Sequence, residues 1–132
     1  MLLGGHLLKH WTRRQQCIAL SSGEAELYAL NHGAKESLGV QQQLRELGVE
    51  LPIEVLTDAS AARGMVHRTG AGRVKHIEVQ VFWLQQKVNT NALVVSKIAR
   101  IKNIADTMTT CWDHRNHTLF DGLGLDCPAE VP

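Results

Sequence analysis

The stretch "ALSSGEAELYAL", from Ala19 to Leu30, predicts the start of a long helix. Ser21 and Glu24 fit the S-x-x-E capping box, in which the serine oxygen accepts a backbone N–H and the glutamate reaches back towards another. Gly48 is typical of a left-handed C-cap, so we expect the helix to begin at Ser21 and to end at Gly48. The apolar residues between these ends recur at spacings of three and four, the period of a half-buried helix, at Leu27, Leu30, Ala34 and Leu38.

The two glutamates of this stretch are expected on different sides of the helix. At about 100° per residue, Glu26 lies on the side of Leu30, Gly33 and Leu44, at the edge of the apolar stripe, and Glu24 points away from it. A carboxylate that borders a core needs a partner, because burying it unpaired is costly. We expect the partner of Glu26 to be either a metal ion or a lysine or arginine.

Helices and strands alternate along the rest of the chain. Gly4-Gly5 predicts a hairpin, followed by extended chain, and residues 52–58 and 92–98 read as strands. Helices are expected over 60–67 and 77–88 and after Asn103. This alternation predicts an α/β domain.

Composition and charge favour one soluble globular domain of 132 residues, 44% hydrophobic and 20% charged. The sequence has no apolar run long enough for a membrane span and no signal-peptide pattern at its start. The three cysteines are an odd number. We therefore expect reduced thiols and an intracellular protein, cytoplasmic or nuclear, that is not secreted.

Positive charge is clustered although the net charge is only +1. Such clusters either contact phosphates or are solvated loops and helix ends. The clusters are Lys9, Arg13 and Arg14; Arg68, Arg73 and Lys75; and Lys97, Arg100 and Lys102.

Two further acids stand at the ends of expected elements. Asp58 ends a strand, where ligands of open α/β sheets collect, and it would equally serve as the N-cap of the next helix. Asp106 lies in the first turn of the last helix, where aspartate also interacts favourably with the helix dipole. Each acid has a structural explanation, but together with Glu26 they indicate a candidate metal site.

Four motifs, in this order, resemble the ribonuclease H domain of copia-type retrotransposon polyproteins: "ALSSGEAELYAL", "VLTDASAA", "RVKHIEVQVFWLQQKV" and "NIADTMTT". The family patterns have the forms L-S-S-x-E-A-E-x-x-A, D-N-x-(S/A)-A, K-H-I-(D/E) and A-D-x-x-T-K. Ala59 and Thr110 depart from these patterns, at positions that hold no metal ligand. The resemblance covers Leu2 to Leu125, which implies a domain over 1–125 and a C-terminal tail over 126–132.

The resemblance implies a ribonuclease H-like fold, a mixed sheet flanked by helices, and hydrolysis of the RNA strand of RNA–DNA hybrids. In that family, two Mg²⁺ or Mn²⁺ ions activate water and stabilise the leaving oxygen, and a cluster of carboxylates holds them. By resemblance, the catalytic and metal-binding residues are Glu26, Asp58 and Asp106. Nucleic-acid contacts are expected from Arg13, Arg14, Arg73, Lys75 and His76, and for His76 the resemblance implies either a structural or a substrate-contacting role.

The family carries one more aspartate on its first strand, whereas no acidic residue precedes Glu24 here. We therefore expect the fold to lack the first strand and most of the second, with exposed strand edges. The isolated chain is then expected to be weakly active or inactive. Either the upstream reverse transcriptase portion of the same polyprotein completes it, or the sequence is a remnant or truncated reading frame.

Other kinds of site are less consistent with the sequence. A zinc site at Cys111, His114, His117 and Cys127 lacks a familiar finger spacing. A hydrolase triad using Ser22 lacks the G-x-S-x-G elbow, and no phosphate-binding P-loop occurs. Two other functions remain open: an inactive retroelement remnant with weak nucleic-acid binding, and an α/β interaction domain with no nucleic-acid role.

Overall fold

The computed structural model describes residues 1–12, 18–68 and 78–105. The chain divides into two compact units, one of residues 1–14 with 100–132 and one of residues 15–99. In the described ranges, no helix is both long enough and apolar enough to span a membrane.

The first unit contains the predicted hairpin. Strands β1 (Leu2–Leu3) and β2 (His6–Leu7) pair antiparallel. Gly4 and Gly5 join them with φ of 56° and 95°, the left-handed conformation that a tight two-residue hairpin turn requires. The 3₁₀ helix η2 (Arg100–Lys102) belongs to the same unit, and most of the helix expected after Asn103 lies outside the described residues.

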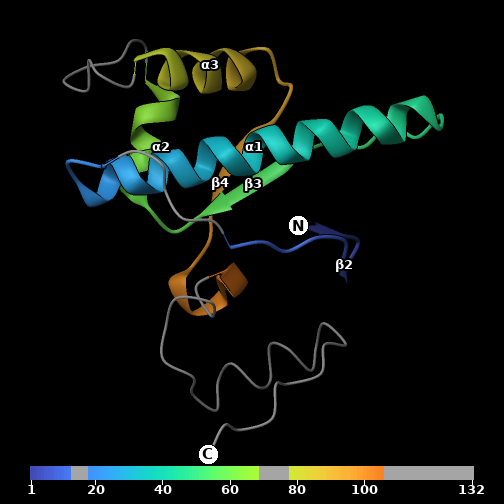
Figure 1. Ribbon diagram of the computed structural model, residues 1–132, viewed down its shortest axis with the longest axis horizontal. Coiled ribbons are helices and arrows are strands. Elements are labelled where there is room, and N and C mark those ends of the chain that lie inside the picture. The colour runs from blue at the N-terminus through green and yellow to red at the C-terminus, as the bar shows by residue number, and fades with distance from the viewer. Residues whose placement is uncertain (13–17, 69–77, 106–132) are drawn as a thin grey trace, which may run out of the picture. The chain divides into compact units, whose positions relative to one another are not determined.

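The second unit alternates helices and strands as the sequence predicts. Its elements are α1 (Ser22–Glu46), β3 (Glu54–Thr57), α2 (Ser60–His67), α3 (Glu78–Asn89) and β4 (Val94–Lys97). Strands β3 and β4 pair in parallel, and α2 and α3 form the crossover between them, because parallel neighbours cannot be joined by a tight turn. Figure 1 shows the long helix α1 running across this pair of strands.

The predicted α/β class is confirmed, and the described elements are compatible with part of a ribonuclease H-like fold. One detail differs from the expectation of a mixed sheet. The described strands form two separate two-stranded sheets, one antiparallel and one parallel.

Both ends of α1 follow from local sequence. Ser21 is the N-cap, as predicted. At the other end Gly48 has a φ of +80°, its N–H donates to the Arg45 carbonyl at 2.9 Å, and the Val49 N–H donates to the Leu44 carbonyl at 2.9 Å. These two bonds form a Schellman motif, which satisfies carbonyl groups that the helix end would leave unpaired.

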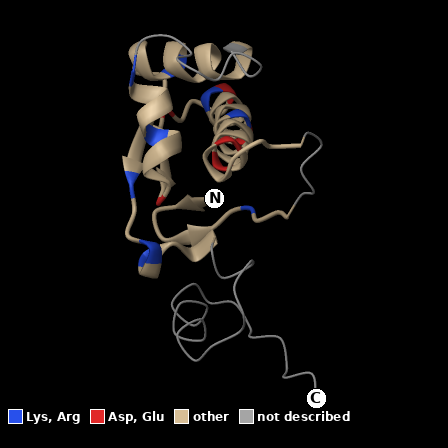
Figure 2. Cartoon of the chain, turned by 90° about the vertical axis from the view of Figure 1, so that its left-hand side faces the viewer, with Lys and Arg blue, Asp and Glu red and all other residues tan. Residues whose placement is uncertain are grey.

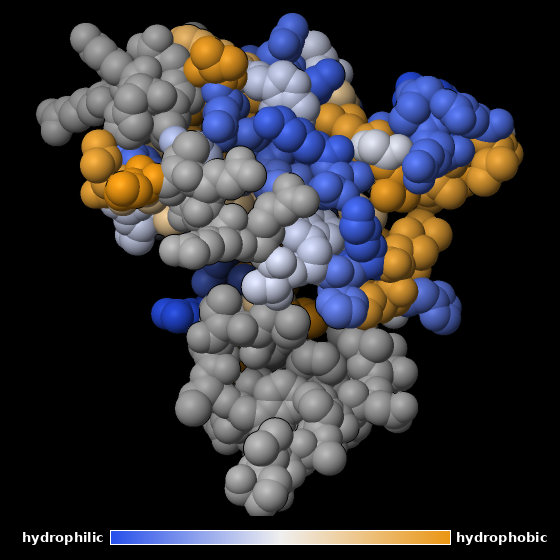
Figure 3. All heavy atoms as spheres, in the orientation of Figure 1, coloured by the Kyte–Doolittle hydropathy of each residue, from blue (hydrophilic) through white to orange (hydrophobic). Residues whose placement is uncertain are grey.

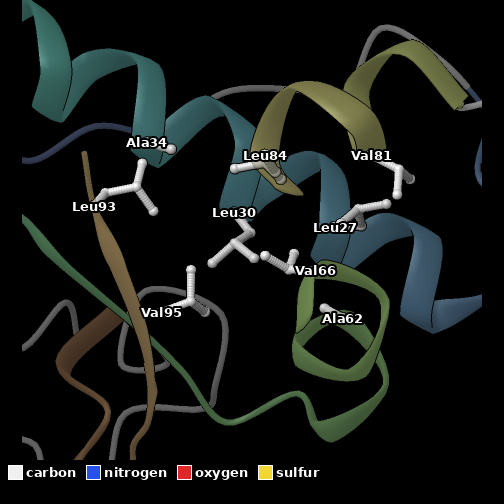
Figure 4. Close-up of a cluster of buried hydrophobic side chains, with 9 residues drawn as sticks. All are labelled: Leu27, Leu30, Ala34, Ala62, Val66, Val81, Leu84, Leu93 and Val95. Atoms are coloured by element: carbon white, nitrogen blue, oxygen red, sulfur yellow. The ribbon is translucent and has the colours of Figure 1, made fainter. Parts of the chain in front are cut away.

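The core of the second unit lies where the three helices meet the parallel strands (Figure 4). Fully burying one leucine or valine contributes about 1.5–3 kcal/mol. Of the apolar positions that periodicity predicts on α1, Leu27, Leu30 and Ala34 are buried and Leu38 is partly buried. The core residues are Leu27, Leu30, Ala34, Ala62, Val66, Val81, Leu84, Leu93 and Val95.

Apolar side chains also reach the surface. Leu56 on β3 and Val94 on β4 are 49% and 52% exposed. Figure 3 shows hydrophobic residues beside a wide hydrophilic area on one face of the molecule.

Candidate functional site

The first turn of α1 is built by the predicted capping box. The Ser21 Oγ accepts the Glu24 N–H at 3.2 Å, and the Glu24 Oε2 accepts the Leu20 N–H at 2.8 Å. The glutamate therefore reaches one residue further back than the N-cap itself. Glu24 is 6% exposed, so this carboxylate is a buried structural group.

The predicted orientation of the two glutamates is wrong. Glu24 is buried and Glu26 is exposed. The buried face of α1 includes Asn31, whose Nδ2 donates to the Gln80 Oε1 at 2.9 Å. Because α3 supplies this polar partner, Asn31 lies inside and the buried stripe is rotated towards Glu24. Glu26 therefore needs no partner on account of burial, and its assignment as a ligand rests on the resemblance alone.

Asp58 directly follows β3 and is half-buried. It is not the N-cap of α2: that position is Ala59, and α2 has no side-chain cap. The Ala59 N–H instead donates to the Thr57 Oγ1 at 3.1 Å. Thr57 pairs with Lys97, the last residue of β4, so Asp58 lies at the carboxyl edge of the parallel strands. This is the edge at which α/β sheets collect ligands.

A close helix contact joins the segments that carry Glu26 and Asp58. A Cβ added to Gly23 would lie 3.2 Å from the Ala61 Cβ, so the missing side chain of Gly23 allows the first turn of α1 to approach the first turn of α2. Glu26 follows Gly23 by one helical turn, and Asp58 precedes Ala61 by three residues. The two acids thus belong to segments that meet at one place in the fold.

The remaining predicted site residues lie outside the described residues. This holds for Asp106, for the four ligands of the zinc alternative and for the expected phosphate contacts at Arg13, Arg14, Arg73, Lys75 and His76. Within residues 1–12, 18–68 and 78–105, no group of three or more histidines, cysteines, aspartates or glutamates could hold a metal ion. The described part therefore contains two of the three predicted ligands.

The two described acids fit a hard divalent cation in chemical type. Carboxylate oxygens are the ligands that Mg²⁺ prefers, and Mg²⁺ usually keeps several waters. Glu26 is exposed and Asp58 half-buried, so both side chains reach solvent, from which a hydrated ion would come. The donor set suits Mg²⁺ or Mn²⁺ better than a thiolate-seeking metal.

A cluster of two lysines and one tryptophan was not predicted from the sequence. Trp83 on α3 has the ammonium groups of Lys35 and Lys87 at 5.6 Å and 5.9 Å from its ring centroid. The sequence carries no signal for this cluster, because α1 and α3 meet only in the fold. Figure 2 shows lysines and arginines on more than one helix of this unit.

Hollows open among the described residues of the second unit. One of about 570 Å³ lies between α1, α3 and the chain that enters β3 and β4. Another, of about 450 Å³, is lined by Ser60, Arg63, Gly64, His67 and Val95.

The amino-acid sequence is similar to parts of several transposon polyproteins. The chain is 32% identical over 111 residues to the retrovirus-related Pol polyprotein from transposon TNT 1-94 of Nicotiana tabacum, an alignment that covers 80% of the chain and 8% of that polyprotein. It is 26% identical over 110 residues to each of the retrovirus-related Pol polyproteins from transposons RE1 and RE2 of Arabidopsis thaliana, with 81% of the chain and 8% of each polyprotein covered. No protein-family model and no solved structure matches the chain.

Homologues of this chain are therefore retrovirus-related Pol polyproteins from plant transposons, and the chain spans less than a tenth of their length. The retrotransposon part of the resemblance is confirmed. The alignments cover one short region of these polyproteins and do not name its activity. We therefore propose an activity from the residues of the candidate site.

Proposed function

We propose that this chain is a ribonuclease H-type region of a retrotransposon Pol polyprotein and acts in the hydrolysis of the RNA strand of RNA–DNA hybrids. The observation that carries the proposal is the position of Asp58. It stands at the carboxyl edge of the parallel strands, where the first turns of α1 and α2 pack together. The motifs around Glu26, Asp58 and Asp106 and the Pol polyprotein homologues support the same assignment.

In this proposal the three carboxylates of Glu26, Asp58 and Asp106 hold Mg²⁺ or Mn²⁺. Two such ions, when bound, activate a water molecule and stabilise the leaving oxygen of a phosphodiester. The protein fixes the ligands by its backbone: Asp58 by the end of β3 and Glu26 by the capped first turns of α1. The solvent exposure of Glu26 leaves room for a substrate phosphate on this side of the helix.

The proposed substrate contacts are electrostatic. Arg13, Arg14, Arg73, Lys75 and His76 are assigned to the phosphates of the hybrid, which gives affinity without sequence preference. The reverse transcriptase portion of the same polyprotein is the proposed partner of this region.

The test is cleavage of an end-labelled RNA annealed to DNA, with Mg²⁺ and with Mn²⁺, by the chain and by Asp58→Asn. We expect slow RNA cleavage that Asp58→Asn abolishes and that Glu50→Gln, which removes a distant exposed carboxylate, leaves unchanged. Cleavage that persists in Asp58→Asn contradicts the proposal.

A second candidate is a catalytically inactive remnant that retains weak nucleic-acid binding. It is favoured by the same lack of carboxylates before Glu24, since a two-metal site needs several. Hybrid binding that weakens with salt, without any cleavage, supports this candidate. A chain that neither binds nor cleaves the hybrid contradicts both.

A further inference from the structure

The hollow of about 570 Å³ lies at the opposite end of the parallel strands from Asp58. Pro52 and Ile53 of its wall precede β3, and Ala92 and Val94 lie at the start of β4. It is therefore separate from Asp58. Its volume falls within the roughly 300–1,000 Å³ of typical small-molecule sites. The lining residues are Leu38, Gln41, Gln42, Arg45, Pro52, Ile53, Trp83, Lys87, Asn91, Ala92 and Val94.

Two ammonium groups from different helices lie near the ring of Trp83, which lines this hollow together with Lys87. Lys35 of α1 and Lys87 of α3 lie 5.6 Å and 5.9 Å from the centroid of the Trp83 ring. In the described part of the chain, neither lysine has a carboxylate within ion-pair distance. A lysine over an aromatic ring gains about 0.5–1 kcal/mol at an exposed site and about 2 kcal/mol when desolvated, and the half-buried Trp83 lies between these cases, so an anion could draw both ammonium groups to itself at a cost of about 1–2 kcal/mol each.

The rest of the wall combines an apolar floor with polar groups. Leu38 and Ile53 are partly buried and pack against the core. Gln41 is fixed by donation of its Nε2 to the Leu51 carbonyl at 2.6 Å, and its amide oxygen accepts no hydrogen bond from the described residues. Arg45 pairs with Glu50 at 3.4 Å, but both side chains are more than half exposed, so this pair is weak and easily exchanged for another anion.

We propose that this hollow binds a nucleotide unit. Its phosphate lies between Lys35 and Lys87 beside Trp83, and its base lies over the apolar floor within reach of the Gln41 amide. The ligand is either a free nucleotide or one unit of a polynucleotide, since both present the same phosphate ester and flat base. The proposal is independent of the ribonuclease H assignment, because neither Glu26 nor Asp58, the two acids of that site within the described residues, lines the hollow.

The first test is binding of adenosine monophosphate, of adenosine, and of a labelled single-stranded oligonucleotide to the full chain, by calorimetry and fluorescence anisotropy. We expect the monophosphate to bind and adenosine to bind at least about tenfold more weakly, because charge-assisted bonds to the phosphate are lost. An oligonucleotide that binds more tightly than the monophosphate indicates a polynucleotide ligand, and equal affinities indicate a free nucleotide. Absence of binding by both phosphate ligands overturns the proposal.

The second test uses charge-matched variants. The double variant Lys35→Gln with Lys87→Gln should weaken monophosphate binding by about tenfold or more, whereas Lys97→Gln with Lys102→Gln should stay within about twofold of the original chain. Equal losses in the two double variants mean non-specific charge attraction and contradict the proposal. Asp58→Asn should bind the monophosphate normally, so failure of this site and failure of the metal site are distinguishable.

The third test is spectroscopic. The chain has three tryptophans, and nucleotide binding should change the fluorescence of Trp83 alone. The change should disappear in Trp83→Phe, which preserves an aromatic ring at a half-buried position. A fluorescence change that persists in Trp83→Phe places the ligand elsewhere and contradicts the proposal.

Discussion

Replacing Glu24 with alanine removes the carboxylate that accepts the Leu20 N–H at 2.8 Å, whereas replacing Glu26 removes an exposed carboxylate from the same helix. The two changes delete the same charge two residues apart. We expect only Glu24→Ala to destabilise the fold. The contrast separates the structural glutamate from the one proposed to bind metal.

The expected size of the effect follows from the burial of the two partners. Loss of a helix cap costs about 0.5–2 kcal/mol. Glu24 is 6% exposed and Leu20 is 75% exposed, and the hydrogen bond between them is partly buried, so water can compensate part of the loss at the Leu20 N–H. The Ser21 bond to the Glu24 N–H remains in the variant. We therefore expect a loss of about 1 kcal/mol for Glu24→Ala and a change within about 0.5 kcal/mol for Glu26→Ala.

Urea unfolding followed by circular dichroism measures both values. With an m-value of about 2 kcal/mol/M, a loss of about 1 kcal/mol lowers the midpoint by about 0.5 M. Glu24→Gln is the matched control, because its amide oxygen can still accept the Leu20 N–H. Equal destabilisation by Glu24→Ala and Glu26→Ala, or none by Glu24→Ala, would refute the reasoning.

Two further predictions concern the helices and the core. Gly48→Ala should cost about 1–2 kcal/mol because Gly48 has a φ of +80°. Gly39→Ala should instead stabilise by about 0.5–1 kcal/mol, since a Cβ there meets no described atom within 4 Å. The same urea experiment measures both changes in the free energy of unfolding. Destabilisation by both substitutions, or stabilisation by both, would contradict the backbone conformations of the two glycines. Leu84→Ala should cost about 2–5 kcal/mol because Leu84 is 0% exposed, and Leu56→Ala, at 49% exposure, should cost less. Thermal unfolding measures the two losses of stability. A larger loss of stability in Leu56→Ala than in Leu84→Ala would contradict the assigned core.

Features that depend on neighbouring residues were predictable from the sequence. The capping box at Ser21 and the Schellman motif at Gly48 each involve atoms only a few residues apart. The local sequence is therefore almost sufficient to predict both ends of the helix. The hairpin at Gly4-Gly5 follows in the same way from the backbone freedom of glycine.

Features that depend on packing between distant segments were not predictable. Periodicity places Glu26 at the edge of the apolar stripe and Glu24 away from it. The contact of Asn31 with Gln80 on α3 makes Asn31 a buried residue and Glu24 the buried glutamate. The meeting of Lys35, Lys87 and Trp83 has the same origin, since two helices supply it. The role of Asp106 stays a prediction, because this residue lies outside the described residues.

The most direct test of the proposed ribonuclease H site is the NMR line broadening that Mn²⁺ causes in the full chain. At low Mn²⁺ concentrations the account predicts simultaneous loss of the amide signals around Glu26 and around Asp58, and recovery of both in Asp58→Asn. Glu50→Gln should behave like the original chain. Broadening around only one of the two acids, or broadening that Asp58→Asn leaves unchanged, would contradict a metal ion shared by Glu26 and Asp58.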